Sequence, residues 1–321
     1  MEGVLTPADV LREIEPVLVI GAGFMGTAVA RALIERGLPV NVLTRSPASL
    51  HAVDSAMAPR LLFDDLTTSG VVDLIAAHRH VVLAAGGASP AVSNGYTAAT
   101  LHSELELLEL ILSAARVRLG QGLTYLSSGG AVYGDAPTVP TPESCRSVPI
   151  SDYGYAKLAG EELVRVGVEE YGVRARIMRV ANAYGPGQPS AGVQGVVGAA
   201  FRAAMTGEPM MLVDGGRVVR DFVYVDDVVT AILATMDLAE DIAVLNVGSG
   251  VGTSIAEVVR LVTAVTGLTV PTFMEDTRPF DVRPSVLDIR ELQRRVAFVP
   301  TTLENGLERT WANACDSRLR A

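Results

Sequence analysis

The chain has 321 residues, of which 49% are hydrophobic and 5% aromatic, and it carries a formal net charge of −10 at pH 7. This length can bury one large core or two coupled ones, so a compact enzyme is expected. Nucleic-acid and membrane-surface binders need a basic footprint that this acidic chain lacks, so neither partner is expected. Any anionic ligand must therefore be held by local arginines.

The cysteines and the N-terminal residues contain no metal or export signal. Cys145 and Cys315 lie far apart and match no metal-binding spacing, so we expect unpaired thiols and no metal site. The first apolar run, residues 16–20, is short, has no basic segment before it and ends in a glycine turn, unlike a signal peptide. No run reaches transmembrane length. We therefore expect a cytoplasmic protein.

Short apolar runs alternate with longer helical patterns in the first half of the chain, which is typical of parallel strands joined by crossover helices. This alternation predicts an α/β fold with a Rossmann-type, doubly wound parallel sheet. The predicted strands are 17–20, 40–43, 60–63, 80–84, 123–127 and 174–180, and the predicted helices are 24–36, 97–116 and 153–171.

One predicted helix carries a clear apolar stripe. Leu101, Leu105, Leu108 and Leu112 are spaced at i, i+4, i+7 and i+11, so they lie on one face. This face must pack on something. The sheet is the simplest partner, and a dimer contact shared with the helix that begins at Tyr153 is the alternative.

The pattern changes after Val180, where the prolines and glycines of residues 184–189 cannot continue a regular element. Shorter elements follow at 210–213, 226–236, 243–247 and 254–266. We predict a dinucleotide-binding domain over 1–183, to which 221–249 returns. Residues 184–220 and 250–321 are predicted to form a smaller C-terminal α/β domain that binds the substrate.

A glycine pattern follows the first predicted strand directly and opens a helix. Gly21, Gly23 and Gly26 form G-x-G-x-x-G, with Phe24 and Met25 inside the pattern. Gly21 permits the tight turn, Gly23 lets the backbone approach a pyrophosphate, and Gly26 lets the helix lie close to the strand. The helix N-terminus then faces the negative charge, so this turn predicts a dinucleotide site.

The end of the second strand indicates which dinucleotide binds. A carboxylate there would bind the ribose of NAD, but the chain has Thr44, Arg45 and Ser46, which can donate hydrogen bonds to, or pair with, the 2′-phosphate of NADP. NADP is therefore favoured over NAD, although Arg45 could instead stack on adenine or point to water. Asp65 and Leu66, just past the third strand, could line the adenine end.

Tyr153 and Lys157 are spaced to lie one helical turn apart on the same face. An isolated tyrosine titrates at about pH 10, and a nearby ammonium favours the phenolate. Such a pair can exchange a proton with a substrate hydroxyl while a hydride moves to or from a nicotinamide. Ser127 and Ser128 end the preceding strand, at the sheet edge where ligands bind in open α/β sheets.

Several motifs occur in an order that resembles the nucleotide-sugar epimerases and dehydratases, which are extended short-chain dehydrogenases/reductases of the UDP-glucose 4-epimerase type. The similarity runs from about Val17 to Trp311. Its motifs are the glycine turn, the Ser-Ser…Val-Tyr-Gly strand end at 127–134, Tyr-x-x-x-Lys, and the segments 179–188, 220–227 and 246–250.

The resemblance implies a role for each site residue. Tyr153 would be the acid/base and Lys157 its partner, also touching the nicotinamide ribose. Asn182 would contact the substrate diphosphate, which Arg220 and Arg278 would clamp. The implied catalytic residues are Tyr153, Lys157 and Ser128, and the implied cofactor contacts are Gly21, Gly23, Phe24, Met25, Gly26, Thr44, Arg45, Ser46, Asp65, Leu66, Ala84, Ala85, Tyr153 and Lys157.

The chain departs from the family pattern at several positions. Gly129 stands where these epimerases usually carry the catalytic Ser or Thr, so either Ser128 takes that role or the hydrogen bond is absent; we predict Ser128. Gly130 and Ala131 stand where related 4,6-dehydratases carry an acid pair, which argues against dehydration. Glu104 replaces a usual asparagine, and Ile20 stands where many relatives have a glycine.

We expect an epimerase that oxidises a sugar hydroxyl to a ketone and reduces the ketone on its other face, with NADP or NAD held tightly. An NADPH-dependent reductase of a nucleotide-linked keto sugar is the main alternative. A dinucleotide-binding regulator without turnover is a third, for which Gly129 is the sequence signal. The expected partners are a nucleotide-sugar substrate and a second copy of the chain in a homodimer.

Overall fold

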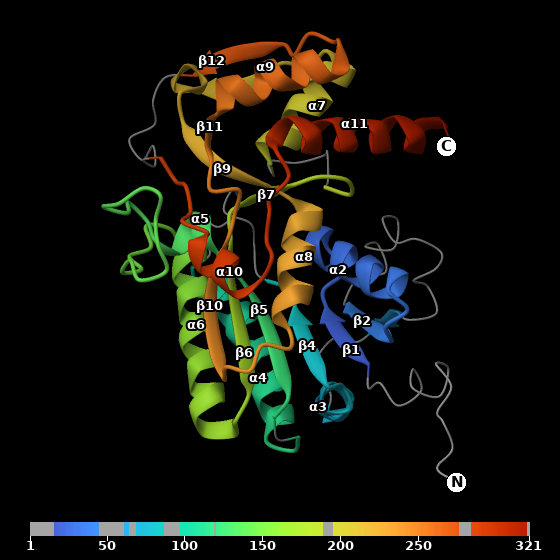
Figure 1. Ribbon diagram of the computed structural model, residues 1–321, viewed down its shortest axis with the longest axis vertical. Coiled ribbons are helices and arrows are strands. Elements are labelled where there is room, and N and C mark those ends of the chain that lie inside the picture. The colour runs from blue at the N-terminus through green and yellow to red at the C-terminus, as the bar shows by residue number, and fades with distance from the viewer. Residues whose placement is uncertain are drawn as a thin grey trace.

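The computed structural model of the protein contains a large sheet flanked by helices and, above it in Figure 1, a smaller region built of short strands and helices. It describes residues 16–44, 61–63, 69–86, 97–118, 120–188, 195–275 and 284–319. Within these ranges, no helix is long and apolar enough to cross a membrane.

The large sheet has seven strands in the order β10-β6-β5-β4-β1-β2-β3, and all neighbours are parallel. The strand order reverses between β1 and β4, where the chain crosses from one half of the sheet to the other. Ligands bind outside the carboxyl ends of the strands at such a point. The strands are β1 (Val17–Ile20), β2 (Val40–Thr44), β3 (Leu61–Phe63), β4 (His80–Leu83), β5 (Gly122–Ser128), β6 (Arg174–Val180) and β10 (Ile242–Val247).

Both faces of this sheet are covered, which is why its strands are continuous apolar runs. On β1, Val17 and Val19 join one buried cluster, while Leu18 and Ile20 join another on the opposite face. Helices α2 (Phe24–Glu35) and α8 (Val225–Thr235) cover the first face. Helices α3 (Ser69–Ala76), α4 (Thr97–Ala115) and α6 (Asp152–Tyr171) cover the second (Figure 1).

The smaller region has its own core. It contains the three-stranded sheet β11-β9-β7 and the parallel pair β12-β8. Its core includes Tyr184, Phe201 and Leu261, and the ring of Trp311 stacks on Phe201 at 5.9 Å between centroids. The elements are β7 (Asn182–Tyr184), α7 (Val196–Thr206), β8 (Met210–Val213), β9 (Val219–Tyr224), β11 (Gly252–Ser254), α9 (Ile255–Thr266), β12 (Thr272–Glu275) and α11 (Leu303–Leu319).

The predicted fold class is confirmed: a Rossmann-type, doubly wound parallel sheet with a smaller α/β region toward the C-terminus. Strands β1 and β6 have the predicted bounds, and the other predicted strands differ by one or two residues. Helices α3, α7 and α11 and the two short helices α5 (Gly129–Val132) and α10 (Arg290–Arg295) were not predicted. The division into domains and the cytoplasmic location stay predictions.

The spacing of the four leucines predicted the buried face of α4 only in part. Leu108 and Leu112 are buried against the sheet, but Leu101 and Leu105 are only half-buried. The fully buried side of the helix also includes Glu104, which is 1% exposed. A carboxylate on the inner face of a helix needs a partner inside the protein.

Candidate active site

The glycine turn lies between β1 and β4, at the point where the strand order reverses. Gly21 has φ 107°, and a Cβ there would lie 2.6 Å from the amide nitrogen of Ala85. A Cβ on Gly26 would lie 1.9 Å from the Gly21 carbonyl oxygen. Neither position admits a side chain. Because glycine has no Cβ, α2, β1 and the end of β4 can approach each other closely here.

Gly23 differs from the other two glycines because a Cβ there would meet none of the described residues within 4 Å. Gly23 is also the N-cap of α2, and among the described residues no side chain caps this end of the helix. Phe24 and Met25 follow as the first two helical residues, both half-buried.

Some of the remaining predicted cofactor residues lie in the described part of the chain, and others do not. Thr44 ends β2 and is 7% exposed, and Ala84 and Ala85 follow β4, where both amides bond to the Ile20 carbonyl oxygen. Four others lie outside the described residues: Arg45, Ser46, Asp65 and Leu66.

Tyr153 and Lys157 lie in the first turns of α6, as their spacing predicts. The helix begins after Ser151, whose hydroxyl accepts a hydrogen bond from the Gly154 amide at 3.2 Å. The Lys157 Nζ lies 5.9 Å from the centroid of the Tyr153 ring and 5.1 Å from that of Tyr125. Tyr153 is half-buried, whereas Lys157 is 5% exposed.

Lys157 has a carboxylate partner that the sequence did not predict. Its Nζ donates to Glu104 Oε1 at 2.7 Å, and the Tyr125 hydroxyl donates to the same oxygen at 2.7 Å. Burial alone would lower the pKa of Lys157, but the charge of Glu104, the nearby Tyr153 and the hydrogen bond to Glu104 together outweigh it, so this pKa is raised and Lys157 is an ammonium at neutral pH. Burial, and then the charge of Glu104, raises the pKa of Tyr125 well above its usual value.

The glycine turn and the Tyr153–Lys157 pair are joined by one short segment. Ala85 contacts Gly21, and a Cβ on the next residue, Gly86, would lie 2.9 Å from Lys157 Nζ. The end of β4 therefore touches the turn on one side and the lysine on the other. The two predicted motifs belong to the same crevice.

The end of β5 supplies the serine hydroxyls. Ser127 is buried and donates to Glu161 Oε1 at 2.5 Å, so its hydroxyl is already used. Ser128 is half-buried and is the N-cap of α5, although its side chain makes no capping bond. A Cβ on Gly129 would lie 2.5 Å from Leu287 Cδ1. A side chain at 129 would therefore have to displace Leu287, and the adjacent hydroxyl is that of Ser128.

Two of the four predicted substrate residues, which are Ser128, Asn182, Arg220 and Arg278, lie on neighbouring strands. β7 pairs with β9 so that Asn182 is opposite Phe222, and Arg220 is two residues from Phe222, so Asn182 and Arg220 share a face of the small sheet. The Asn182 side chain donates to the Asp221 carbonyl oxygen at 3.0 Å, and Arg220 Nη1 donates to the Val219 carbonyl oxygen at 2.8 Å. Arg278 lies outside the described residues.

The sequence matches the model of the NAD dependent epimerase/dehydratase family over residues 17–248, which includes the glycine turn, the Tyr153–Lys157 pair and the β9 segment. The chain belongs to this family. Its proteins depend on NAD, and the recognition drawn from the order of the motifs is confirmed.

Family members of known structure have the same fold. The UDP-glucose 4-epimerase of Thermotoga maritima, solved with UDP-glucose, is 31% identical with a TM-score of 0.86, and 94% of this chain and 99% of that one are covered. The UDP-glucose 4-epimerase of Thermus thermophilus, solved with NAD, is 28% identical with a TM-score of 0.83, over 93% and 98% of the two chains.

The family relatives also include a reductase. The dTDP-4-dehydro-6-deoxy-D-allose reductase of Streptomyces bikiniensis is 30% identical over 311 residues, which is 92% of this chain and 94% of the relative. Similarity at this level therefore includes both epimerases and keto-sugar reductases.

Asp221, in the β9 motif, is a structural junction of this family member. It is 1% exposed and accepts hydrogen bonds from the amides of Ser249, Gly250 and Leu287 and from the Ser249 hydroxyl. Burial raises its pKa, and these bonds oppose that shift. Asp221 thus fixes two segments, residues 249–250 and the segment at Leu287, beside the strand that carries Arg220.

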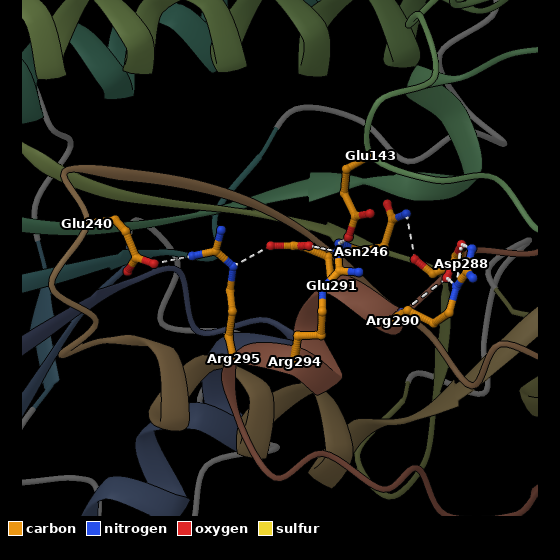
Figure 2. Close-up of polar contacts among 8 residues, drawn as sticks. All are labelled: Glu143, Glu240, Asn246, Asp288, Arg290, Glu291, Arg294 and Arg295. Carbon is orange, nitrogen blue, oxygen red and sulfur yellow. Dashed lines mark hydrogen bonds and ion pairs between the residues drawn. The ribbon is translucent and has the colours of Figure 1, made fainter.

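Asn246 has a comparable role at the end of β10. Its amide group donates to the carbonyl oxygens of Thr141 and Asp288, its Oδ1 accepts from the Tyr133 hydroxyl, and its backbone amide donates to Glu143. Figure 2 shows Asn246 between Glu143 and Asp288. The loop after α5 is thereby tied to the large sheet.

The sequence contained signals for some of these contacts. Glu104 occupies the inner face of α4, four residues before Leu108, so its need for a buried partner follows from the helical period. The identity of that partner does not, because α4 and α6 are brought together only by the fold. Asp221 and Asn246 lie in motifs that the sequence singled out, but nothing in their spacing indicates which loops they bind.

Proposed function

We propose that this chain is an NAD(P)-dependent epimerase that acts on a nucleotide-activated sugar through a transient ketone. The contact of the β4 end with both Gly21 and Lys157 supports this most directly, because it connects the cofactor turn to the acid/base pair. Family membership supports the same chemistry.

The residues present fit a dinucleotide. Among the described residues, the uncapped N-terminus of α2 and the open space at Gly23 suit a pyrophosphate, whose charge the helix end stabilises. A nicotinamide held here would supply the acceptor and the donor for the hydride of the sugar carbon. Tyr153 removes the proton of the sugar hydroxyl and gives it back, Lys157 holds a positive charge beside the phenol, and Ser128 orients the hydroxyl.

The substrate is proposed to be a UDP- or dTDP-sugar, the classes named for the relatives. Asn182 and Arg220 would bind its diphosphate, together with Arg278. Removing a contact made equally in the ground and transition states raises KM and leaves kcat unchanged. Arg220→Met should therefore raise KM for the nucleotide sugar without a matching fall in kcat.

For the cofactor, we propose that NADP binds at least as well as NAD. The end of β2 supplies Thr44 followed by Arg45 and Ser46, with no carboxylate to repel a 2′-phosphate. Titration of the protein with each dinucleotide tests this, and Arg45→Glu should shift the preference toward NAD. Tighter binding of NAD by the unaltered protein would contradict it.

A second copy of the chain is the proposed partner, and it would bind on α4 and α6. The groove between these helices is lined by apolar Leu105, Leu163 and Val166, and Val166 is 43% exposed. Sedimentation should find a dimer, and Val166→Glu should yield monomers.

The epimerase proposal is tested with purified protein and no added cofactor. A panel of UDP- and dTDP-sugars is incubated with the protein, and the products and the released dinucleotide are quantified. Epimer formation with the cofactor retained is the expected result.

The reductase is the second candidate, because a keto-sugar reductase is 30% identical to this chain. Stoichiometric release of oxidised cofactor, with consumption of added NADPH and a keto sugar, would replace the epimerase with this reductase.

A further inference from the structure

A small cluster of polar groups is buried beneath the candidate acid/base pair. The side chains of Lys157 and Glu104 are 6% and 2% exposed, and their charged atoms are 2.7 Å apart. Tyr125 donates to Glu104 from β5, and a Cβ on Gly86 would lie 3.0 Å from the second Glu104 oxygen. The pair is thus enclosed between α4, α6, β5 and the end of β4.

The charges around Lys157 can be counted. Within the described residues, it faces Glu104 from α4, Tyr125 from β5, and Tyr153 and Glu161 from its own helix. The Glu161 carboxylate is already matched, because Arg179 Nη2 donates to it at 2.6 Å. With both phenols protonated, Lys157 and Glu104 sum to zero.

We propose that Glu104 is a positioning residue that holds the Lys157 ammonium and offsets its charge, so that Lys157 favours the Tyr153 phenolate less than it would without this carboxylate. Loss of the Tyr153 proton would place a third charge beside this buried pair and leave the cluster with a net charge of minus one, which is unfavourable. Without the Glu104 charge, the same loss would take the cluster from plus one to zero. The carboxylate therefore opposes the effect that a lysine alone has on a tyrosine.

The consequence for turnover rests on the proposed function. A protonated Tyr153 starts as a proton donor: its O–H bond breaks and the proton goes to the carbonyl oxygen of the keto sugar as the carbon is reduced. Oxidation of a hydroxyl needs the phenolate and should speed up as the pH rises. The pH at which the rate of oxidation begins to rise should therefore depend on whether residue 104 carries a charge.

The test compares Glu104→Gln, which removes the charge and keeps the shape, with Glu106→Gln. Glu106 is an exposed carboxylate two residues along the same helix, so it controls for net charge. The near-ultraviolet phenolate absorbance is titrated for each protein, and the signal of the matching Tyr153→Phe protein is subtracted, which isolates Tyr153 without any substrate.

In Glu104→Gln the Tyr153 phenolate should appear about one pH unit or more below its position in the unaltered protein. Glu106→Gln should leave it unchanged. An unshifted signal in folded Glu104→Gln, or an equal shift in Glu106→Gln, would overturn the proposal. Should Glu104→Gln fail to fold, Glu104→Asn takes its place: a phenolate signal at lower pH than in the unaltered protein supports the proposal, and an unshifted signal overturns it.

The activity arm separates this inference from the proposed function. In Glu104→Gln the acid limb of kcat/KM for oxidation should move to lower pH together with the phenolate signal. A protein with no nucleotide-sugar turnover at any pH would end the proposed function, and the phenolate titration would still confirm or overturn the role of Glu104.

Discussion

Two groups of ion pairs in this molecule use similar chemistry with different consequences. Lys157 and Glu104 have side chains 6% and 2% exposed, whereas Arg290 and Arg294 on α10 are 79% and 70% exposed beside their carboxylates. Figure 2 shows the arginines of α10 and their carboxylate partners in a row. The same charges are exposed to water in one place and removed from it in the other.

The difference shows which charges affect chemistry. Water and salt screen the α10 pairs, so each contributes little beyond local order. Beneath the sheet edge, a single uncompensated charge changes the ionisation of every neighbour. A third pair, Glu161 with Arg179, is just as buried, but its carboxylate is already matched by the Arg179 guanidinium, so it is expected to affect mainly stability.

Removal of the Tyr153 hydroxyl should have the largest effect. Tyr153→Phe should lower turnover of the nucleotide sugar by roughly 10²- to 10⁴-fold, because the proton transfer loses its donor and acceptor. Steady-state kinetics measures this, with Tyr155→Phe as the control, since Tyr155 lies on the same helix and is 55% exposed. Comparable losses in both variants would remove Tyr153 from the mechanism.

Breaking the buried structural pair should come next. Glu161→Gln leaves Arg179 without its carboxylate and should lower the free energy of unfolding by about 3–5 kcal/mol. The neighbouring Glu162, whose side chain is 65% exposed, pairs with Arg165 at 3.5 Å. Glu162→Gln should cost less than about 1 kcal/mol in the same urea titration. Equal costs would show that burial does not separate the two classes.

Acid should destabilise the protein through a buried histidine. Burial lowers the pKa of His80 on β4 to about 3, so the folded protein keeps this ring neutral while the unfolded chain protonates it near 6.5. The unfolded state therefore binds more protons, and stability falls as the pH drops from 6.5 to about 3, by about 1.4 kcal/mol per unit.

His80→Gln should remove this dependence, measured as the unfolding free energy of variant and unaltered protein at several pH values. His102→Gln on the exposed side of α4 should retain it. Parallel curves for His80→Gln and the unaltered protein would contradict the assignment.

The smallest effect is expected on α10. Arg294→Gln removes one donor from Glu291, which Arg295 still contacts at 2.7 Å, so stability should change by less than about 1 kcal/mol and less again in high salt. A loss of several kcal/mol in thermal or urea unfolding would mean that this surface group is a cooperative network.

The sequence predicted most of what local pattern controls. The apolar run Val17–Ile20, the glycine turn and the spacing of Tyr153 and Lys157 each depend on neighbouring residues, and each lies where predicted. The bonds of Glu104 to α6 and of Asp221 to residues 249–250 and 287 join residues that are far apart in the chain. Only the packing of whole elements sets those distances, so no spacing could indicate them.

The account depends on hydride transfer between the nucleotide sugar and a nicotinamide bound at the glycine turn, with Tyr153 exchanging the proton of the sugar hydroxyl. Nucleotide sugar should be added to purified protein that retains its dinucleotide, and the fluorescence of the reduced nicotinamide followed in rapid mixing. A transient rise in the unaltered protein, abolished in Tyr153→Phe, is the predicted result. Epimer formation with no reduced nicotinamide, or an equal rise in Tyr153→Phe, would contradict it.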